Sequence, residues 1–365
     1  MIPDLIAHQN RAQLRERVKK EAHSPEYVFQ LLNAIETMAI QDKHTLFEHS
    51  SSGPIKLHFK GQTWQTGLFS TPSLAELESK QTRRSQAKFR FHIMSGADPL
   101  TDIGSLQAFA APHTLFQMAS QFNTLESPGP YITPITRYLS DPTQGPRAAI
   151  SAFAGTFSRH YAAIDKDPSQ SFTQSEQHEI NLLSDAIPIS QIAQIKGGYL
   201  LAEYIYDAPA LAKQLKQNFS RIRVGFQSQV QVGLGHNWVG KVSQPTLINQ
   251  VMSSTLAGGA YSPGIDLNLG PWKEICLSLL KASYYGTLLL AILAKDKYVV
   301  LTPIGGGVFD NPHGLIWEAL FWALDKAEPF LEEPIDIALN AYHFKLDDGL
   351  CSKALETREG ERLLF

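Results

Sequence analysis

Three consecutive glycines, Gly305 to Gly307, interrupt the segment VVLTPIGGGVFDNP at residues 299–312. Apolar, strand-like residues precede the glycines, and a helical pattern begins near His313. Glycine allows positive φ and lets a ligand approach the bare main chain. The free N–H groups of such a turn, together with those of the following helix, favour the binding of an anion such as phosphate. The alternative is a tight turn whose glycines serve conformation only.

Polar side chains follow another strand-like run, in MASQFNTLESPGP at residues 118–130. Gln121, Asn123 and Glu126 would stand at the carboxyl end of that strand, where ligands bind in open α/β sheets. Asp141 opens a Pro/Gly-rich turn, DPTQGP, which leads into a helix with small residues on one face. A further strand-like run, LINQVM, passes into small polar residues and glycines at 253–264. These segments are candidates for one shared site.

Several familiar catalytic motifs are excluded. A dinucleotide-binding fingerprint needs a glycine where Asp310 stands, and no Gly-Lys-Ser/Thr follows the glycines. The chain has neither a G-x-S-x-G nor an H-E-x-x-H motif. Its two cysteines, Cys276 and Cys351, are too few for a disulfide framework or a zinc cluster. We therefore expect neither a metal nor a cofactor.

Composition and charge exclude other classes of protein. The 365 residues include 32 Lys and Arg against 35 Asp and Glu, a net charge of −3, which gives no bulk attraction to nucleic acid or anionic lipid. Charged residues appear early in the N-terminal segment, and no run of about 18 uncharged apolar residues occurs. We expect a cytoplasmic protein without nucleic-acid or membrane partners.

The pattern of apolar residues predicts the elements that position these side chains. Residues 1–54 read as a helical N-terminal extension, and residues 55–365 as one α/β domain, because strand-like runs there alternate with helical patterns. Such alternation predicts a mixed or parallel sheet with helices on both faces. The predicted helices cover residues 145–164, 271–294 and 313–327. The strand-like runs lie within residues 55–59, 63–69, 88–94, 115–123, 222–235, 246–254, 297–304 and 334–342.

Four blocks in this order, QFNTLE, DPTQGPRAAISAFAGT, QVMSSTLAGGAYS and VVLTPIGGGVFDNP, resemble macrodomain-type proteins that bind ADP-ribose. The resemblance covers roughly residues 60–328. It is strongest to the divergent bacterial and effector branch that removes ADP-ribose from arginine side chains. The chain departs from poly(ADP-ribose) glycohydrolases, since no Gln-Glu-Glu signature stands beside its glycines. The resemblance implies a three-layer α/β/α macrodomain with a mixed central sheet.

It also implies roles for individual residues. Cleavage of the N-glycosidic bond to arginine passes through an oxocarbenium-like state, which carboxylates would stabilise while one of them activates water. The candidate carboxylates are Glu126, Asp141, Asp310 and Asp266. Each has a structural alternative: a turn cap, a turn initiator, a helix cap and a surface residue, in that order. The implied ADP-ribose ligands are Gln121, Asn123, Gln144, Gly145, Ser253, Ser254, Gly305, Gly306, Gly307, Val308, Phe309 and Asn311.

The function that these features imply is hydrolysis of mono-ADP-ribose from modified proteins, with arginine linkage preferred. The partner would be an ADP-ribosylated protein, and we expect the enzyme to be a monomer. The resemblance further suggests a bacterial effector delivered into a host cell. The alternative from another class is a non-catalytic ADP-ribose-binding module, which needs no carboxylate at the distal ribose. A third possibility is hydrolysis of a free nucleotide in a closed pocket.

Overall fold

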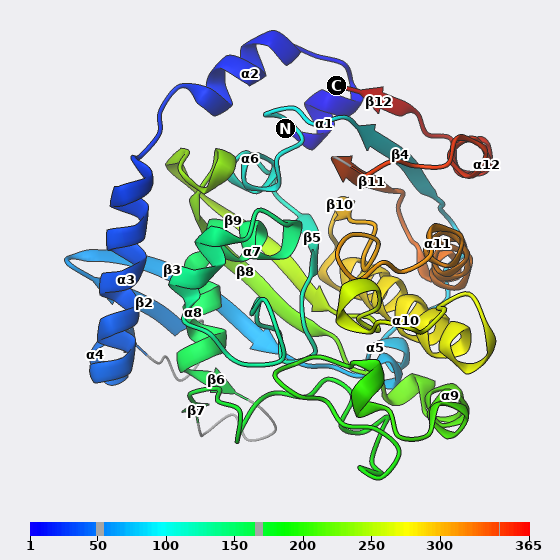
Figure 1. The fold of residues 1–365 in the computed structure, drawn as a ribbon. Coiled ribbons are helices and arrows are strands. Elements are labelled where there is room, and N and C mark those ends of the chain that lie inside the picture. Colours follow the sequence, from blue (N-terminus) through cyan, green and yellow to red (C-terminus); the bar gives the residue numbers. More distant parts are fainter. Residues whose placement is uncertain (49–54, 165–170, 343) are drawn as a thin grey trace.

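The computed structural model describes residues 1–48, 55–164, 171–342 and 344–365. Within these ranges one large mixed sheet runs through the molecule in the order β1-β2-β3-β8-β9-β5-β10-β11-β4-β12 (Figure 1). Its strands, in that order, are Phe47–Glu48, Ile55–Phe59, Gln62–Ser70, Gly225–Leu234, Lys241–Ser253, Thr114–Ala119, Tyr298–Leu301, Ile335–Tyr342, Phe89–Ser95 and Arg362–Leu364. A separate pair joins β6 (Ala163–Ile164) to β7 (Ser171–Phe172).

One half of the large sheet is parallel. Strands β9, β5, β10, β11, β4 and β12 all run in the same direction. Strands β1, β2, β3 and β8 pair antiparallel at the other edge. The central strands β5, β10 and β11 are buried along almost their whole length, as expected for parallel strands covered on both faces. Their carboxyl ends therefore meet at one edge of the sheet.

Helices cover both faces of the sheet and build two hydrophobic cores. The first core joins residues of α5, α9, α10, α11 and α12 to one face, and the second joins residues of α1 to α4 and α6 to α8 to the other. Alternate residues of β10 divide between them: Val299 and Leu301 enter the first core, and Val300 the second. The three-layer α/β/α arrangement with a mixed sheet is confirmed.

Two of the three predicted helices, at 271–294 and 313–327, agree closely with the observed helices α10 and α11. The bounds of the α-helices are Ile2–Ile6 (α1), Arg11–Lys19 (α2), Pro25–Gln41 (α3), Lys43–Leu46 (α4), Leu74–Ser79 (α5), Ile103–Ala108 (α6), Gln144–Ser151 (α7), Phe153–Tyr161 (α8), Ala208–Gln217 (α9), Gly270–Ala294 (α10), His313–Ala327 (α11) and Asp348–Arg358 (α12). The single helix predicted over 145–164 is in fact two, because Ala152 leaves the helical region with φ −106° and ψ 48°. This break lets α7 pack against β5 and α8 against β3 and β8.

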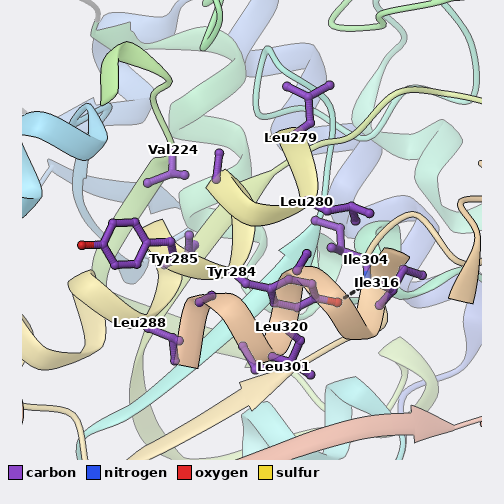
Figure 2. Packing of buried hydrophobic residues seen from close by; sticks show 14 of the residues in the cluster. Val224, Leu279, Leu280, Tyr284, Tyr285, Leu288, Leu301, Ile304, Ile316 and Leu320 are labelled. Carbon is purple, nitrogen blue, oxygen red and sulfur yellow. Dashed lines mark hydrogen bonds between the residues drawn. The ribbon is translucent and has the colours of Figure 1, made fainter. Parts of the chain in front are cut away.

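Helix α10 is long and apolar. Among the described residues it alone has the length and composition to cross a membrane, with a mean hydropathy of 1.6. However, 78% of that stretch is buried inside the protein. Tyr284 and Tyr285 in its middle are almost fully buried, and Figure 2 shows Tyr284 among the apolar side chains that α10 shares with α11. The hydropathy of α10 reflects its place in the first core.

The described part of the predicted N-terminal extension contains helices α1 to α4 and the short strand β1. Leu32 and Ile35 of α3 are fully buried in the second core, together with residues of α7 and α8. Figure 1 shows α3, in blue, standing next to α8 at the antiparallel side of the sheet. The predicted boundary after residue 54 falls at 49–54, outside the described residues. The extension thus shares a core with the α/β part of the chain.

Candidate functional site

A cleft of about 340 Å³ opens at the carboxyl ends of the parallel strands. Each of five neighbouring strands contributes to its lining: Gln121 and Glu126 follow β5, Ser254 and Thr255 follow β9, Gly305 and Gly307 follow β10, Asn340 lies near the end of β11, and Thr101 follows β4. This is the edge at which open α/β sheets bind ligands, and the volume is in the range of small-molecule sites.

The glycine turn forms one wall of the cleft, and its three glycines differ in role. Gly305 has φ +73°, and a Cβ there would lie 2.5 Å from Thr255 Oγ1, so only glycine fits. A Cβ on Gly307 would meet nothing within 4 Å, so its backbone is open to a ligand. Gly306, in contrast, is not in the lining: a Cβ there would lie 2.6 Å from the ring of Phe344 and 2.9 Å from Ile316. Val308 continues the wall and is 57% exposed.

Side chains from the first core hold this turn in place. Asn311 is buried, donates to the carbonyl oxygens of Leu256 (2.8 Å) and Phe309 (3.1 Å), and accepts from Cys276 Sγ (3.3 Å). The hydroxyl of Tyr284 donates to the Thr302 carbonyl (2.9 Å) and accepts from the N–H of Ile304 (3.2 Å), the interaction drawn in Figure 2. Asn311 was predicted to bind ligand, but its amide is occupied by the loop that it supports.

Glu126 is the most perturbed carboxyl group of the cleft. It is 2% exposed, and its Oε1 has no hydrogen-bond partner. Burial raises the pKa of Glu126 well above its usual range, the negative charge of Asp141 raises it further, and Ser120 and the Arg159 guanidinium act in the opposite direction. The N–H of Glu126 donates to Tyr138 Oη (3.1 Å). The prediction for Glu126 as a cleft carboxylate agrees with this position.

Asp141 follows a short 3₁₀-helix, η1 (Ile135–Ser140), as its C-cap residue. Its Oδ1 accepts from the N–H of Thr143 (2.9 Å), so the side chain also forms the turn that was its structural alternative. Asp141 lines the cleft and is half-buried. Glu126 and Asp141 therefore line the same cleft as the glycine turn, and a third lining carboxyl group, that of Asp102, accepts a hydrogen bond from Arg147 (2.8 Å).

The start of α7 lies against Glu126. A Cβ on Gly145 would overlap the Ala119 carbonyl oxygen and Glu126 Oε2, so glycine is needed for this approach. Gln144 joins the same helix to β5, because its Oε1 accepts from the N–H of Ala119 (2.9 Å) and its Nε2 donates to the Gln117 carbonyl (2.9 Å). Gln144 lines the cleft, but its amide already serves the main chain, which leaves it little capacity to bind ribose.

Besides Gly306 and Asn311, four predicted residues lie away from the lining. Asn123 is fully buried: it donates to Glu179 Oε2 (2.9 Å) and accepts from the N–H of Leu125 (3.0 Å), so it shapes the loop. Asp266 is exposed and accepts from the N–H of Asn268, as its surface alternative supposed. Two others also lie outside the lining: exposed Asp310, which makes no side-chain cap on α11, and buried Ser253.

Three aromatic side chains form one wall of the cleft, and of these only Phe309 was predicted from the sequence. Tyr199, Tyr261 and Phe309 all line the cleft, with ring centroids 5.3 to 5.7 Å apart. The Tyr199 hydroxyl donates to the Ser127 carbonyl (2.6 Å), and burial raises its pKa. Tyr199 comes from an irregular segment whose sequence carries no motif, and neither Tyr199 nor Tyr261 was predicted as a site residue. Only the folded chain brings them together.

Arg159 of α8 is a second residue that sequence reasoning missed. Its guanidinium is fully buried and donates to the Thr124 carbonyl (3.3 Å), Gln227 Oε1 (3.3 Å) and Thr156 Oγ1 (3.2 Å). Burial lowers the pKa of Arg159 to about 10, while the charge of Glu126 opposes that change. The Arg159 guanidinium is therefore a buried cation whose hydrogen-bond partners are all neutral. One of these partners, the Thr124 carbonyl, belongs to the loop that carries Glu126.

Several buried polar atoms of the lining have no partner in the protein. They are Gln121 Oε1, Glu126 Oε1, Thr255 Oγ1 and Asn340 Oδ1. Buried polar atoms are nearly always hydrogen-bonded, because an unpaired one costs free energy. Their grouping around one cleft indicates a site for a polar ligand. In the described ranges, no three His, Cys, Asp or Glu side chains gather as metal ligands.

Comparison with known proteins gives distant structural similarity. No family model matches the chain, and no curated protein matches its sequence. Poly(ADP-ribose) glycohydrolase from Thermomonospora curvata is similar over 90% of this chain and 99% of its own, with 13% identity and a TM-score of 0.45. The Deinococcus radiodurans enzyme in complex with ADP-ribose is similar over 79% and 94%, with 14% identity and a TM-score of 0.45. Similarity at this level does not establish the function of this chain.

Proposed function

We propose that this protein hydrolyses ADP-ribose from modified proteins and prefers mono-ADP-ribose attached to arginine. One observation carries the proposal: the cleft that contains the open backbone of Gly305 and Gly307 is also lined by the carboxyl groups of Glu126 and Asp141. The glycine turn suits a diphosphate, which accepts hydrogen bonds from main-chain N–H groups. The carboxyl groups suit the cationic, oxocarbenium-like centre at the distal ribose.

The arrangement supports a different role for each of these two carboxyl groups. Glu126 has the raised pKa and the unpartnered oxygen, so it takes a proton from the attacking water. The water oxygen bonds to the anomeric carbon as the bond from that carbon to the guanidinium nitrogen breaks. The bonding electrons leave with the nitrogen, which yields a neutral guanidine that is then protonated by Glu126. Asp141, which is half-buried, faces the positive charge of the substrate.

The linkage preference is the finer part of the proposal. Support comes from the charge of the site, since an arginine-linked substrate brings a cation to a pair of carboxyl groups, whereas the ester linkage to Glu and the O-glycosidic linkage to Ser bring none. The two similar structures are those of poly(ADP-ribose) glycohydrolases. Polymer cleavage is therefore a second reaction to measure. A binding module without hydrolysis would need neither Glu126 nor Asp141.

The test uses four substrates and a matched pair of variants. Protein carrying arginine-, glutamate- or serine-linked mono-ADP-ribose, and poly(ADP-ribose), are each incubated with the enzyme, and free ADP-ribose is measured. We expect release from the arginine linkage and a loss of about 10²-fold or more in Glu126→Gln, the usual scale for an acid–base group. The control is Asp266→Asn, the same charge change at an exposed residue outside the cleft. Binding of ADP-ribose with no release from any substrate would replace the hydrolase with a binding module.

A further inference from the structure

Helix α3 of the N-terminal extension buries one carboxyl group. Its other buried residues, Val28, Leu32, Ile35 and Ala39, are apolar, but Glu36 is also only 4% exposed. Burying a carboxylate costs free energy unless hydrogen bonds compensate for the lost water. The hydrogen-bond donors to Glu36 should therefore show why the chain keeps a carboxyl group at this buried position.

All the donors to Glu36 come from other parts of the chain, about 100 or more residues away. Its Oε1 accepts from the N–H of Ile135 (2.5 Å) and the hydroxyl of Tyr161 (2.6 Å). Its Oε2 accepts from the N–H of Thr136 (3.1 Å) and the hydroxyl of the same residue (3.0 Å). Ile135 and Thr136 are the first two residues of η1.

Glu36 thus supplies a cap that η1 lacks locally. The residue before η1 is Pro134, and no side chain from η1 or its N-cap residue caps the helix. The first N–H groups of a helix have no partner within it and need an acceptor. Because α3 belongs to the N-terminal extension, that acceptor ties the extension to η1 directly.

Helix η1 in turn holds Glu126 and Asp141. Tyr138, in its middle, is fully buried and accepts the N–H of Glu126 (3.1 Å). Asp141 ends the helix, with its N–H donating to the Tyr138 carbonyl (3.1 Å). A shift of η1 would therefore move Asp141 and release the main chain of Glu126 together.

We propose that Glu36 is a positioning residue that fixes η1, and through it Glu126 and Asp141, so that the N-terminal extension is part of the catalytic unit. This inference rests on the proposed function, because it assigns a catalytic effect to residues of that site. It assigns no contact between Glu36 and the substrate. The glycine turn is held by the other core, so binding of the diphosphate does not depend on Glu36.

The experiment compares Glu36→Gln with Glu26→Gln, an exposed residue on the same helix. In Glu36→Gln we expect kcat for arginine-linked ADP-ribose to fall by about 10-fold or more, with KM and ADP-ribose affinity changed less than about threefold. Amide hydrogen exchange should rise at residues 135–141 and at Glu126. Glu26→Gln should leave kcat and exchange unchanged. A loss of kcat that merely follows the unfolded fraction of Glu36→Gln would overturn the inference.

A milder pair of variants keeps the test open should Glu36→Gln not fold. Thr136→Val removes one donor from η1 itself, whereas Tyr161→Phe removes one donor that lies in α8. Exchange at 135–141 and kcat should change more in Thr136→Val than in Tyr161→Phe. Equal effects, or none in either variant, would refute the role of η1. Because exchange needs no turnover, it tests the positioning even if the wild-type protein hydrolyses none of the substrates, a result that would refute the proposed function alone.

Discussion

Replacing Gly145 with alanine should slow hydrolysis far more than it weakens binding. Gly145 lies in the first turn of α7, where a Cβ would overlap both the Ala119 carbonyl oxygen and Glu126 Oε2 and lie 3.0 Å from Glu126 Cδ. The helix cannot easily slide away, because Gln144 bonds it to the main chain of β5 at two points. Movement of the Glu126 side chain relieves the overlap with Oε2, whereas the overlap with the Ala119 carbonyl oxygen requires a small shift of the main chain of α7 or β5. The methyl group therefore acts on the carboxyl group that we assign as the base.

The size of the effect follows from this geometry. Non-bonded heavy atoms find their best separation at about 3.5 Å or more, so relieving the overlap requires a displacement on the order of 1 Å. A misplacement of about 1 Å in a catalytic group costs about 10²-fold in rate. Overpacking at a buried position also destabilises a protein by about 1 to 3 kcal/mol. ADP-ribose affinity should change by less than about fivefold, since the glycine turn is on another wall of the cleft.

The measurement combines turnover of arginine-linked ADP-ribose, calorimetric affinity for ADP-ribose and urea unfolding. Gly314→Ala is the matched control, because a Cβ there meets nothing within 4 Å and the residue lies in the first turn of α11. It should behave like the parent in all three assays. Full turnover in Gly145→Ala would show that the contact between α7 and Glu126 is not needed for catalysis. An equal loss of affinity and turnover would show that the whole cleft had moved.

Three other predictions follow from individual groups. Gly307→Glu should weaken ADP-ribose binding by about 10²-fold or more in calorimetry without loss of stability, because its side chain meets free space beside the proposed diphosphate position; unchanged affinity would place the diphosphate elsewhere. Asp141→Asn should move the acidic limb of the pH–rate profile to lower pH, because removing the neighbouring negative charge lowers the pKa of Glu126; a shift upward would contradict this coupling. Burial raises the pKa of Asp296 to about 7 in the folded protein. Its contribution to the free energy of unfolding is therefore fully present below about pH 4 and is lost as the pH rises to about 7. In urea unfolding above that pH, the free energy of unfolding of Asp296→Asn should therefore exceed that of wild type by up to about 4 kcal/mol. An equal difference between the two proteins at pH 4 and pH 8 would contradict this prediction.

Local sequence predicts the central elements of the fold because their signals are strong. Strand β10 is a continuous apolar run, β11 is mostly apolar, and α10 and α11 are long apolar helices, so their types follow from composition and spacing. The order of the strands does not follow, since β12 at the end of the chain pairs with β4. The break at Ala152 was also missed, because alanine favours helix and only packing on two sets of strands separates α7 from α8.

The candidate site was predictable where a residue follows a strand end. Glu126, Gly305 and Gly307 come directly after buried strands, and the sheet brings those ends together. The buried amides Asn123 and Asn311 were expected to bind ligand, yet their bonding capacity is used to hold loops. Sequence shows that such a side chain is polar but not which partner it has.

The residues that support the site escaped prediction for a different reason. Glu36 meets η1 across about 100 positions of sequence, and Arg159 reaches Gln227 across 68. Neither belongs to a motif, and each is an ordinary charged residue on a helix when read locally. Their roles depend on burial, which only the packed structure determines.

The two cores that the sheet separates have a consequence for how this protein can change over evolutionary time. The glycine turn is supported from one core by Tyr284 and Asn311, whereas the carboxyl groups are supported from the other through η1 and α7. Mutations that loosen the second core can accumulate while the first still shapes the turn. A lineage could thus lose catalysis and keep recognition by a few substitutions far from the ligand, and protein engineers could follow the same route to convert the cleft into a capture reagent.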